Sequence, residues 1–170
     1  SAMVSNLTID KKGYEKVQSD ALRLAPLGQS IKERAIHCID VDTDAFYAMM
    51  DAMKLPKKTD EEIAYRDAQI EKCTQDAINA PLETLRLAYE ALALAKEVAE
   101  IGNTNALSDA GVAALTALAA AKAANYNVLI NIAGIKDENY KTKTLADAKD
   151  LITKCEALAQ ETEQNVSSRL

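Results

Sequence analysis

The chain has 170 residues, 26 acidic and 20 basic, and its net charge of −6 argues against nucleic acid or an anionic membrane as a general partner. Although 48% of the residues are hydrophobic, only 4% are aromatic, and Gly and Pro are scarce, which favours one helical domain. Three dispersed cysteines and a single histidine argue against a zinc site and favour reduced thiols in a cytoplasmic protein. We expect neither a transmembrane helix nor a signal peptide.

The first long helix is expected at about residues 14–53, after a stretch at residues 1–4 that resembles the end of another helix. Its apolar residues recur at helical spacing through most of this range. Pro26 and Gly28 interrupt the pattern about a third of the way along, which predicts a kink or a local break.

A second long helix is expected after Thr59 and Glu62, which have the spacing of a capping box. Pro81 falls inside this helix and predicts a bend or a split near Asn79, because proline cannot donate a backbone hydrogen bond. The apolar pattern then resumes as far as Gly102, which is placed as the C-terminal cap.

Residues 103–107 are the strongest loop signal between helices. Ser108 or Asp109 is expected to cap a helix over residues 109–132, whose small side chains are typical of a buried helix with close neighbours. Asp137 then caps a last helix that continues toward the C-terminus. With no strand pattern and no repeat, these elements predict an all-α antiparallel bundle of long, kinked helices.

One carboxylate on the first long helix stands on its apolar side. At about 100° per residue, Asp42 projects to that side, whereas Asp40 and Asp44 project to the opposite, solvated face. A buried carboxylate costs desolvation unless it is paired, and burial raises a carboxylate's pKa toward the range useful for acid–base catalysis. Asp42 is therefore interpreted as either a structural acid that caps a neighbouring helix or a catalytic group. The apolar side is formed by Val17, Ala21, Leu24, Ile31, Ala35, Cys38, Ile39, Phe46, Met49 and Met53.

Two further polar groups have both structural and ligand-binding interpretations. The loop before residue 109 leads into a helix N-terminus with free N–H groups, so Asn105 and Asp109 are a turn residue and a cap, or contacts to a ligand. Asn127 and Asn131 share one face of a helix expected to be buried, where their amides need partners from other helices or from a ligand.

A small basic cluster follows the first long helix and consists of Lys54, Lys57 and Lys58. It is either a solvated turn or the basic group closest in sequence to Asp42 that could hold carboxylates. Acids, amides and a basic rim together would suit a polar heterocycle with an anionic tail, although these residues alone do not identify it.

The chain resembles the cyclodeaminase family, which includes the C-terminal domain of formiminotransferase-cyclodeaminase and stand-alone methenyltetrahydrofolate cyclohydrolases. The resemblance covers residues 1–170 as a single domain, and the family's N-terminal helix is expected to be incomplete here. Several ordered motifs at family-like spacing are more specific than any one of them. These motifs are residues 3–8, 42–46, 55–57, 102–111 and 127–131.

The resemblance implies cyclisation of formiminotetrahydrofolate to methenyltetrahydrofolate with loss of ammonia, and it assigns the acid/base role to Asp42. Within the family, the alternative is a methenyltetrahydrofolate cyclohydrolase, in which water takes the place of the amine. An alternative of another class is a non-catalytic helical assembly module, which would be expected to carry Leu at position 42. The residues predicted to bind the substrate are Asn105, Asp109, Asn127, Asn131 and Lys57.

The resemblance also sets expectations for partners. The ligand is a tetrahydrofolate derivative with one or more glutamates in its tail, and no metal or other cofactor is expected. We expect a cytoplasmic homodimer or larger assembly that acts in one-carbon metabolism and histidine degradation, with a formiminotransferase as a candidate partner. Neither nucleic acid nor a membrane is an expected partner.

Overall fold

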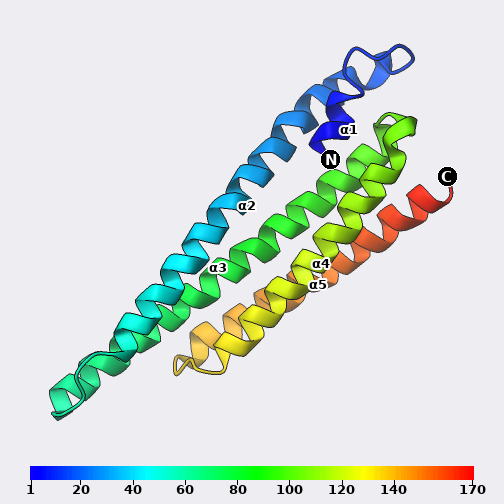
Figure 1. The fold of residues 1–170 in the computed structure, drawn as a ribbon. Coiled ribbons are helices and arrows are strands. Elements are labelled where there is room, and N and C mark those ends of the chain that lie inside the picture. The colour runs from blue at the N-terminus through cyan, green and yellow to red at the C-terminus, as the bar shows by residue number, and fades with distance from the viewer.

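The computed structural model describes all 170 residues as an elongated antiparallel bundle in which successive long helices reverse direction (Figure 1). The predicted all-α fold is confirmed, since every regular element is helical. The elements are α1 (Ala2–Asn6), η1 (Glu15–Val17), α2 (Gln18–Met53), α3 (Asp60–Ile101), η2 (Thr104–Ala106), α4 (Leu107–Ile132) and α5 (Glu138–Ser167).

Two of the predicted helix starts are confirmed by their caps. Thr59 Oγ1 accepts a hydrogen bond from the Glu62 N–H at 3.2 Å, and the Glu62 carboxylate accepts one from the Thr59 N–H at 3.3 Å, which completes the capping box of α3. Asp137 caps α5 by accepting bonds from the N–H groups of Asn139 and Tyr140, each at 3.0 Å.

The predicted cap of α4 is wrong. This helix begins at Leu107 with Ala106 in the capping position, so neither Ser108 nor Asp109 caps it and Asp109 lies within the first turn. The preceding turn η2 supplies the reason, because Asn103 Oδ1 accepts a bond from the Asn105 N–H at 3.0 Å and already orders the chain. The helical conformation therefore starts two residues earlier than the polar residues suggest.

Neither proline splits its helix. Helix α2 continues through Pro26 and α3 continues through Pro81. Pro26 is exposed. Pro81 is buried, and Asn131 on the neighbouring helix α4 donates a side-chain hydrogen bond to the Ala77 carbonyl oxygen at this level of α3.

The core lies mainly between α3, α4 and α5, whereas α2 packs chiefly on α3. Leu24 near the start of α2 joins a second core cluster at the α1 end, but the C-terminal half of α2 buries only Ala45 and Ala52. Most of the apolar side of α2 is therefore not covered within one chain. Ile39 is 65% exposed and Phe46 is 59% exposed.

The short helix α1 lies between α2 and α4 at the end of the bundle that holds both termini (Figure 1). Glycines permit this close approach. A Cβ at Gly28 would lie 2.9 Å from the Ala2 Cβ, and a Cβ at Gly102 would lie 2.8 Å from Val4 Cγ1. Gly102 also ends α3, as predicted, in an extended conformation.

One segment, Thr104–Ile132, is long and apolar enough to cross a membrane by length and composition, with a mean hydropathy of 1.2 and 33% of that window buried. Length and composition alone do not place a helix in a membrane, so the expectation that the chain has no transmembrane helix stays a prediction. Core helices of bundles meet the same criterion, and α4 packs against α3 and α5. Its small side chains account for its high apolar content.

Candidate functional site

A groove runs between α2 and α4, with α3 as its floor and α1 at one end. Its middle holds a pocket of about 430 Å³, to which α2 contributes Asp42, α3 contributes Pro81 and α4 contributes Asn127. A second pocket of about 560 Å³ adjoins it toward the α2–α3 turn and is also bordered by Asp42 and Asn127, together with Asn131. The two pockets share a carboxylate on one wall and an amide on the other.

Asp42 is exposed, so the prediction that it is buried on a core face is wrong for a single chain. The helical period located the apolar side of α2 correctly, but α3 covers only part of that side and leaves Ile39 and Phe46 exposed. The Asp42 carboxylate makes no hydrogen bond or ion pair in this structure. The acid therefore does not cap a neighbouring helix, which removes the structural interpretation, and it stands free at the edge of both pockets.

Asp40 and Asp44 are exposed and border neither pocket, which confirms that they lie on the solvated side of α2. Thr43, one residue after Asp42, donates a hydrogen bond to the Ile39 carbonyl oxygen at 2.8 Å within the same helix. Among the acids at this level of α2, the groove is thus accessible to Asp42 alone.

The structure brings Asn127 and Asn131 to the same groove as Asp42. The exposed Asn127 donates from Nδ2 to the Ala123 carbonyl oxygen of its own helix at 3.2 Å. The half-buried Asn131 donates from Nδ2 to the Ala77 carbonyl oxygen on α3 at 3.1 Å. One of the two amides therefore has a partner on another helix, and the other has a partner within its own helix only.

Asn105 and Asp109 lie at the opposite end of α4 from the pocket. Asp109 and Asn127 are 18 residues apart, which is about five turns and roughly 27 Å along the helix axis. Because 18 residues make about a whole number of turns, both side chains leave α4 in the same direction. A single chain does not bring them together around one small molecule.

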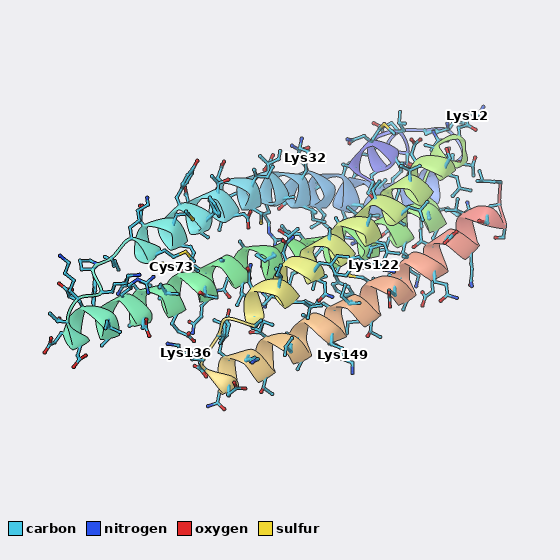
Figure 2. All side chains as sticks on the ribbon, turned by 60° about the horizontal axis from the view of Figure 1, so that its bottom comes forward. Lys12, Lys32, Cys73, Lys122, Lys136 and Lys149 are labelled. Atoms are coloured by element: carbon cyan, nitrogen blue, oxygen red, sulfur yellow. The ribbon has the colours of Figure 1, made fainter.

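Lys57 is exposed in the turn between α2 and α3 and borders neither pocket. Its neighbour Lys54 forms an exposed ion pair with Asp51 at 2.8 Å. Asp42 is about 16 Å along the axis from the last residue of α2. The labelled lysines elsewhere are spread along the bundle and form no basic patch (Figure 2).

Sequence reasoning missed the ion pairs that hold α2 to α3 near the groove. Arg34 donates to Glu90 at 2.7 Å and to Glu83 at 3.0 Å. These bonds, to Glu90 first and then to Glu83, raise the pKa of the Arg34 guanidinium. Nothing in the sequence around Arg34 indicates its partners, because both lie about 50 residues further along the chain.

The groove offers one carboxylate that can accept and return a proton and two amides that can orient a polar ligand. No three His, Cys, Asp or Glu side chains gather in a way that could hold a metal ion. Apolar side chains such as Ile39 and Phe46 flank the carboxylate. This combination suits proton transfer on a neutral or weakly charged heterocycle.

Comparison with known proteins identifies relatives along almost the whole chain. The family model described as formiminotransferase-cyclodeaminase matches residues 1–166. A methenyltetrahydrofolate cyclohydrolase from Methylorubrum extorquens is 37% identical over 169 residues, which cover 99% of this chain and 81% of that protein. A formimidoyltransferase-cyclodeaminase from Rattus norvegicus is 31% identical over 144 residues, but they cover 85% of this chain and only 27% of that longer protein.

A solved structure has the same fold. The formiminotetrahydrofolate cyclodeaminase from Thermotoga maritima superimposes with a TM-score of 0.88 over 98% of this chain and 79% of that chain, at 24% sequence identity. At this identity the likeness establishes the arrangement of helices.

Proposed function

Because the chain belongs to the formiminotransferase-cyclodeaminase family, we propose that it is an enzyme that cyclises formiminotetrahydrofolate to methenyltetrahydrofolate and releases ammonia. The family match carries this proposal, and the free carboxylate of Asp42 between two pockets supports it. The fold that the chain shares with a cyclodeaminase is a further support.

The proposed reaction needs two proton transfers and one site can perform both. The bridge nitrogen of the folate attacks the carbon of the protonated amidine and loses a proton. The departing NH₂ group must gain that proton to leave as ammonia, and the methenyl product keeps the positive charge. Asp42 accepts the first proton and returns it to the leaving nitrogen, so the carboxylate ends the cycle in the form in which it began. The apolar neighbours of Asp42 favour the flat ring system of the folate.

A second candidate is hydrolysis of methenyltetrahydrofolate. One observation favours it, because the relative named as a cyclohydrolase is 37% identical to this chain and aligns with 99% of it. In this reaction water attacks the same carbon that the amine leaves in cyclisation. The same acid and the same pocket serve both reactions, so the substrate has to be tested directly.

The deciding experiment supplies the purified chain with formiminotetrahydrofolate and follows the methenyl absorbance and ammonia together. A cyclodeaminase produces both in equal amounts. A cyclohydrolase consumes methenyltetrahydrofolate added at the start and releases no ammonia. A chain that accelerates neither reaction, assayed beside an active relative as a control, would contradict the proposed function and would favour a non-catalytic assembly module.

Replacing Asp42 with Asn keeps the size of the side chain and removes the proton transfer. We expect turnover to fall by roughly 100-fold or more, in line with general acid–base contributions, while the helical circular dichroism is unchanged. Asp40→Ala and Asp44→Ala are matched controls on the solvated side of α2 and should stay within a few-fold of the parent. Near-parental turnover of Asp42→Asn would remove the acid/base role.

We also propose that the chain forms a homodimer through the groove side of the molecule. This side exposes Ile39 and Phe46 on α2 and Ile130 on α4. Such a group of exposed apolar side chains is typical of a protein–protein interface. An antiparallel contact between two copies of α4 would bring the Asp109 end of one copy near the pocket of the other. A second copy would also cover the apolar side of α2 around Asp42.

The expected axis of this dimer lies near residue 118, midway between Asp109 and Asn127. Ala119→Arg would place two positive charges close together at that axis, so we expect light scattering to report a monomer and activity to fall. Ala157→Arg introduces the same charge on an exposed position of α5 and should leave the dimer intact. A parent chain that is monomeric at micromolar concentration would contradict the proposal.

We propose that Lys57 attracts the glutamate tail of the substrate by long-range electrostatics, since it borders neither pocket. Lys57→Ala should raise the Michaelis constant more for a polyglutamylated than for a monoglutamylated substrate, and added salt should reduce the difference. Lys149→Ala, a substitution on α5, serves as the control for net charge. An equal effect on both substrates would remove Lys57 from the site.

The three free cysteines support a reducing, cytoplasmic compartment. The relative from Rattus norvegicus combines a transferase and a cyclodeaminase in its name. We therefore propose a formiminotransferase as the partner that supplies the formimino substrate in histidine degradation.

A further inference from the structure

Pro81 leaves one carbonyl of α3 without its normal donor. In an α-helix the N–H of residue 81 would donate to the carbonyl of Ala77, but proline has no N–H. Helix α3 nevertheless continues through this point. Asn131 on α4 donates from Nδ2 to the Ala77 carbonyl oxygen at 3.1 Å and so supplies the missing donor from another helix.

This bond fixes which way the Asn131 amide faces. A carbonyl oxygen can only accept, so the NH₂ end of the amide must point toward Ala77. The bond to Ala77 is the one hydrogen bond that the side chain makes in this structure. The Oδ1 atom is thus left as a free acceptor on a residue that borders the pocket containing Asp42.

The bond is also the side-chain tie between α3 and α4 on the groove side. Asn127, one turn earlier on α4, bonds only to its own helix. On the other side of α3, Tyr140 of α5 donates to Asn79 Oδ1 at 3.1 Å and lies 3.3 Å from the Gln75 carbonyl oxygen. The segment of α3 before Pro81 is therefore held from one side by Tyr140 and from the other by Asn131.

We propose that Asn131 is a positioning residue. By donating to the carbonyl that Pro81 leaves unpaired, it holds the C-terminal part of α4 against the floor of the groove, and this sets the position of Asn127 relative to Asp42. The inference rests on the proposed function for its activity measurements. The hydrogen bond and its coupling to Pro81 do not depend on the reaction.

Two substitutions separate the stabilising part of this bond from its positioning part. Asn131→Ala leaves the Ala77 carbonyl without a donor and also removes the tie between α3 and α4. Pro81→Ala restores the backbone N–H, which can donate to Ala77 within α3, and because a carbonyl has two lone pairs the bond from Asn131 can remain. In the double variant the Ala77 carbonyl accepts a hydrogen bond from the N–H of residue 81, but the side-chain bond that joins α4 to α3 is still missing.

The first measurement is the melting temperature of the four proteins in this cycle. Asn131→Ala should lower Tm by roughly 2–5 °C in the parent, as expected for one partly buried hydrogen bond in a chain of this size. In the Pro81→Ala background the same change should lower Tm by less than half as much. An equal decrease in both backgrounds would overturn the inference. Asn127→Ala is the matched control for stability and should show no coupling to Pro81→Ala.

The second measurement is kcat and KM at a temperature where all variants are folded. We expect Asn131→Ala to lower kcat/KM by roughly tenfold or more, because small displacements of substrate-binding groups have effects of this size. The loss should persist in the double variant, because Pro81→Ala restores the donor but not the tie. The positioning role would be overturned if Pro81→Ala restored both Tm and activity in the double variant. It would also be overturned if Asn131→Ala kept kcat/KM within twofold of the parent.

Two outcomes keep this inference distinct from the proposed function. If the parent chain has neither activity, the proposed function fails, while the Tm cycle still tests the bond between Asn131 and Ala77. If the parent is active and the Tm cycle shows no coupling, the inference fails alone. If Asn131→Ala does not fold, the comparison is made between Pro81→Ala and the double variant, and failure of the double variant to fold would overturn the inference.

Discussion

The architecture depends on α3, because every other long helix packs against it. Helices α4 and α5 cover one part of its surface and share a large apolar core with it, whereas α2 covers another part and contacts α4 hardly at all. The space between α2 and α4 is therefore open, and α3 forms its floor. The groove results directly from this division of the surface of one central helix.

The groove has two differently stabilised walls. The α4 wall belongs to the main core and is tied to the floor by Asn131. The α2 wall has few buried side chains in its C-terminal half and is held to α3 partly by the exposed ion pairs of Arg34 with Glu83 and Glu90. Exposed ion pairs contribute little to stability, so the wall that carries Asp42 is the more easily displaced. A partner on the apolar side of α2 would reduce that mobility.

Much of the fold could be predicted from the sequence, because helical period and end signals are local. The period of apolar residues predicted the long helices, and Thr59 and Asp137 marked two starts correctly. The predicted start of α4 is wrong because the turn stabilised by Asn103, and not a polar cap, orders the chain there. Both prolines lie within continuous helices, since a missing donor can be replaced or left to solvent.

The candidate site was only partly predictable, because burial is a property of the assembled structure. The helical spacing of the apolar residues in α2 correctly placed Asp42 on the apolar side of this helix. The spacing cannot show whether another helix covers that side. The pairing of Asn131 with Ala77 joins residues 54 positions apart and has no local signal. Within a single chain Asp109 and Asn127 lie far apart along α4. Only the family resemblance could therefore assign them to one site.

The length of α4 between Asp109 and Asn127 is itself a constraint on how this sequence can change. Substitutions among the small side chains of this segment alter contacts locally and leave both ends facing the same way. Inserting or deleting one residue would instead rotate one end by about 100° relative to the other. Such a change would leave the composition and helical content almost unaltered while directing the two polar ends to different sides of the molecule. Variation in this helix should therefore occur by exchange of side chains at constant length.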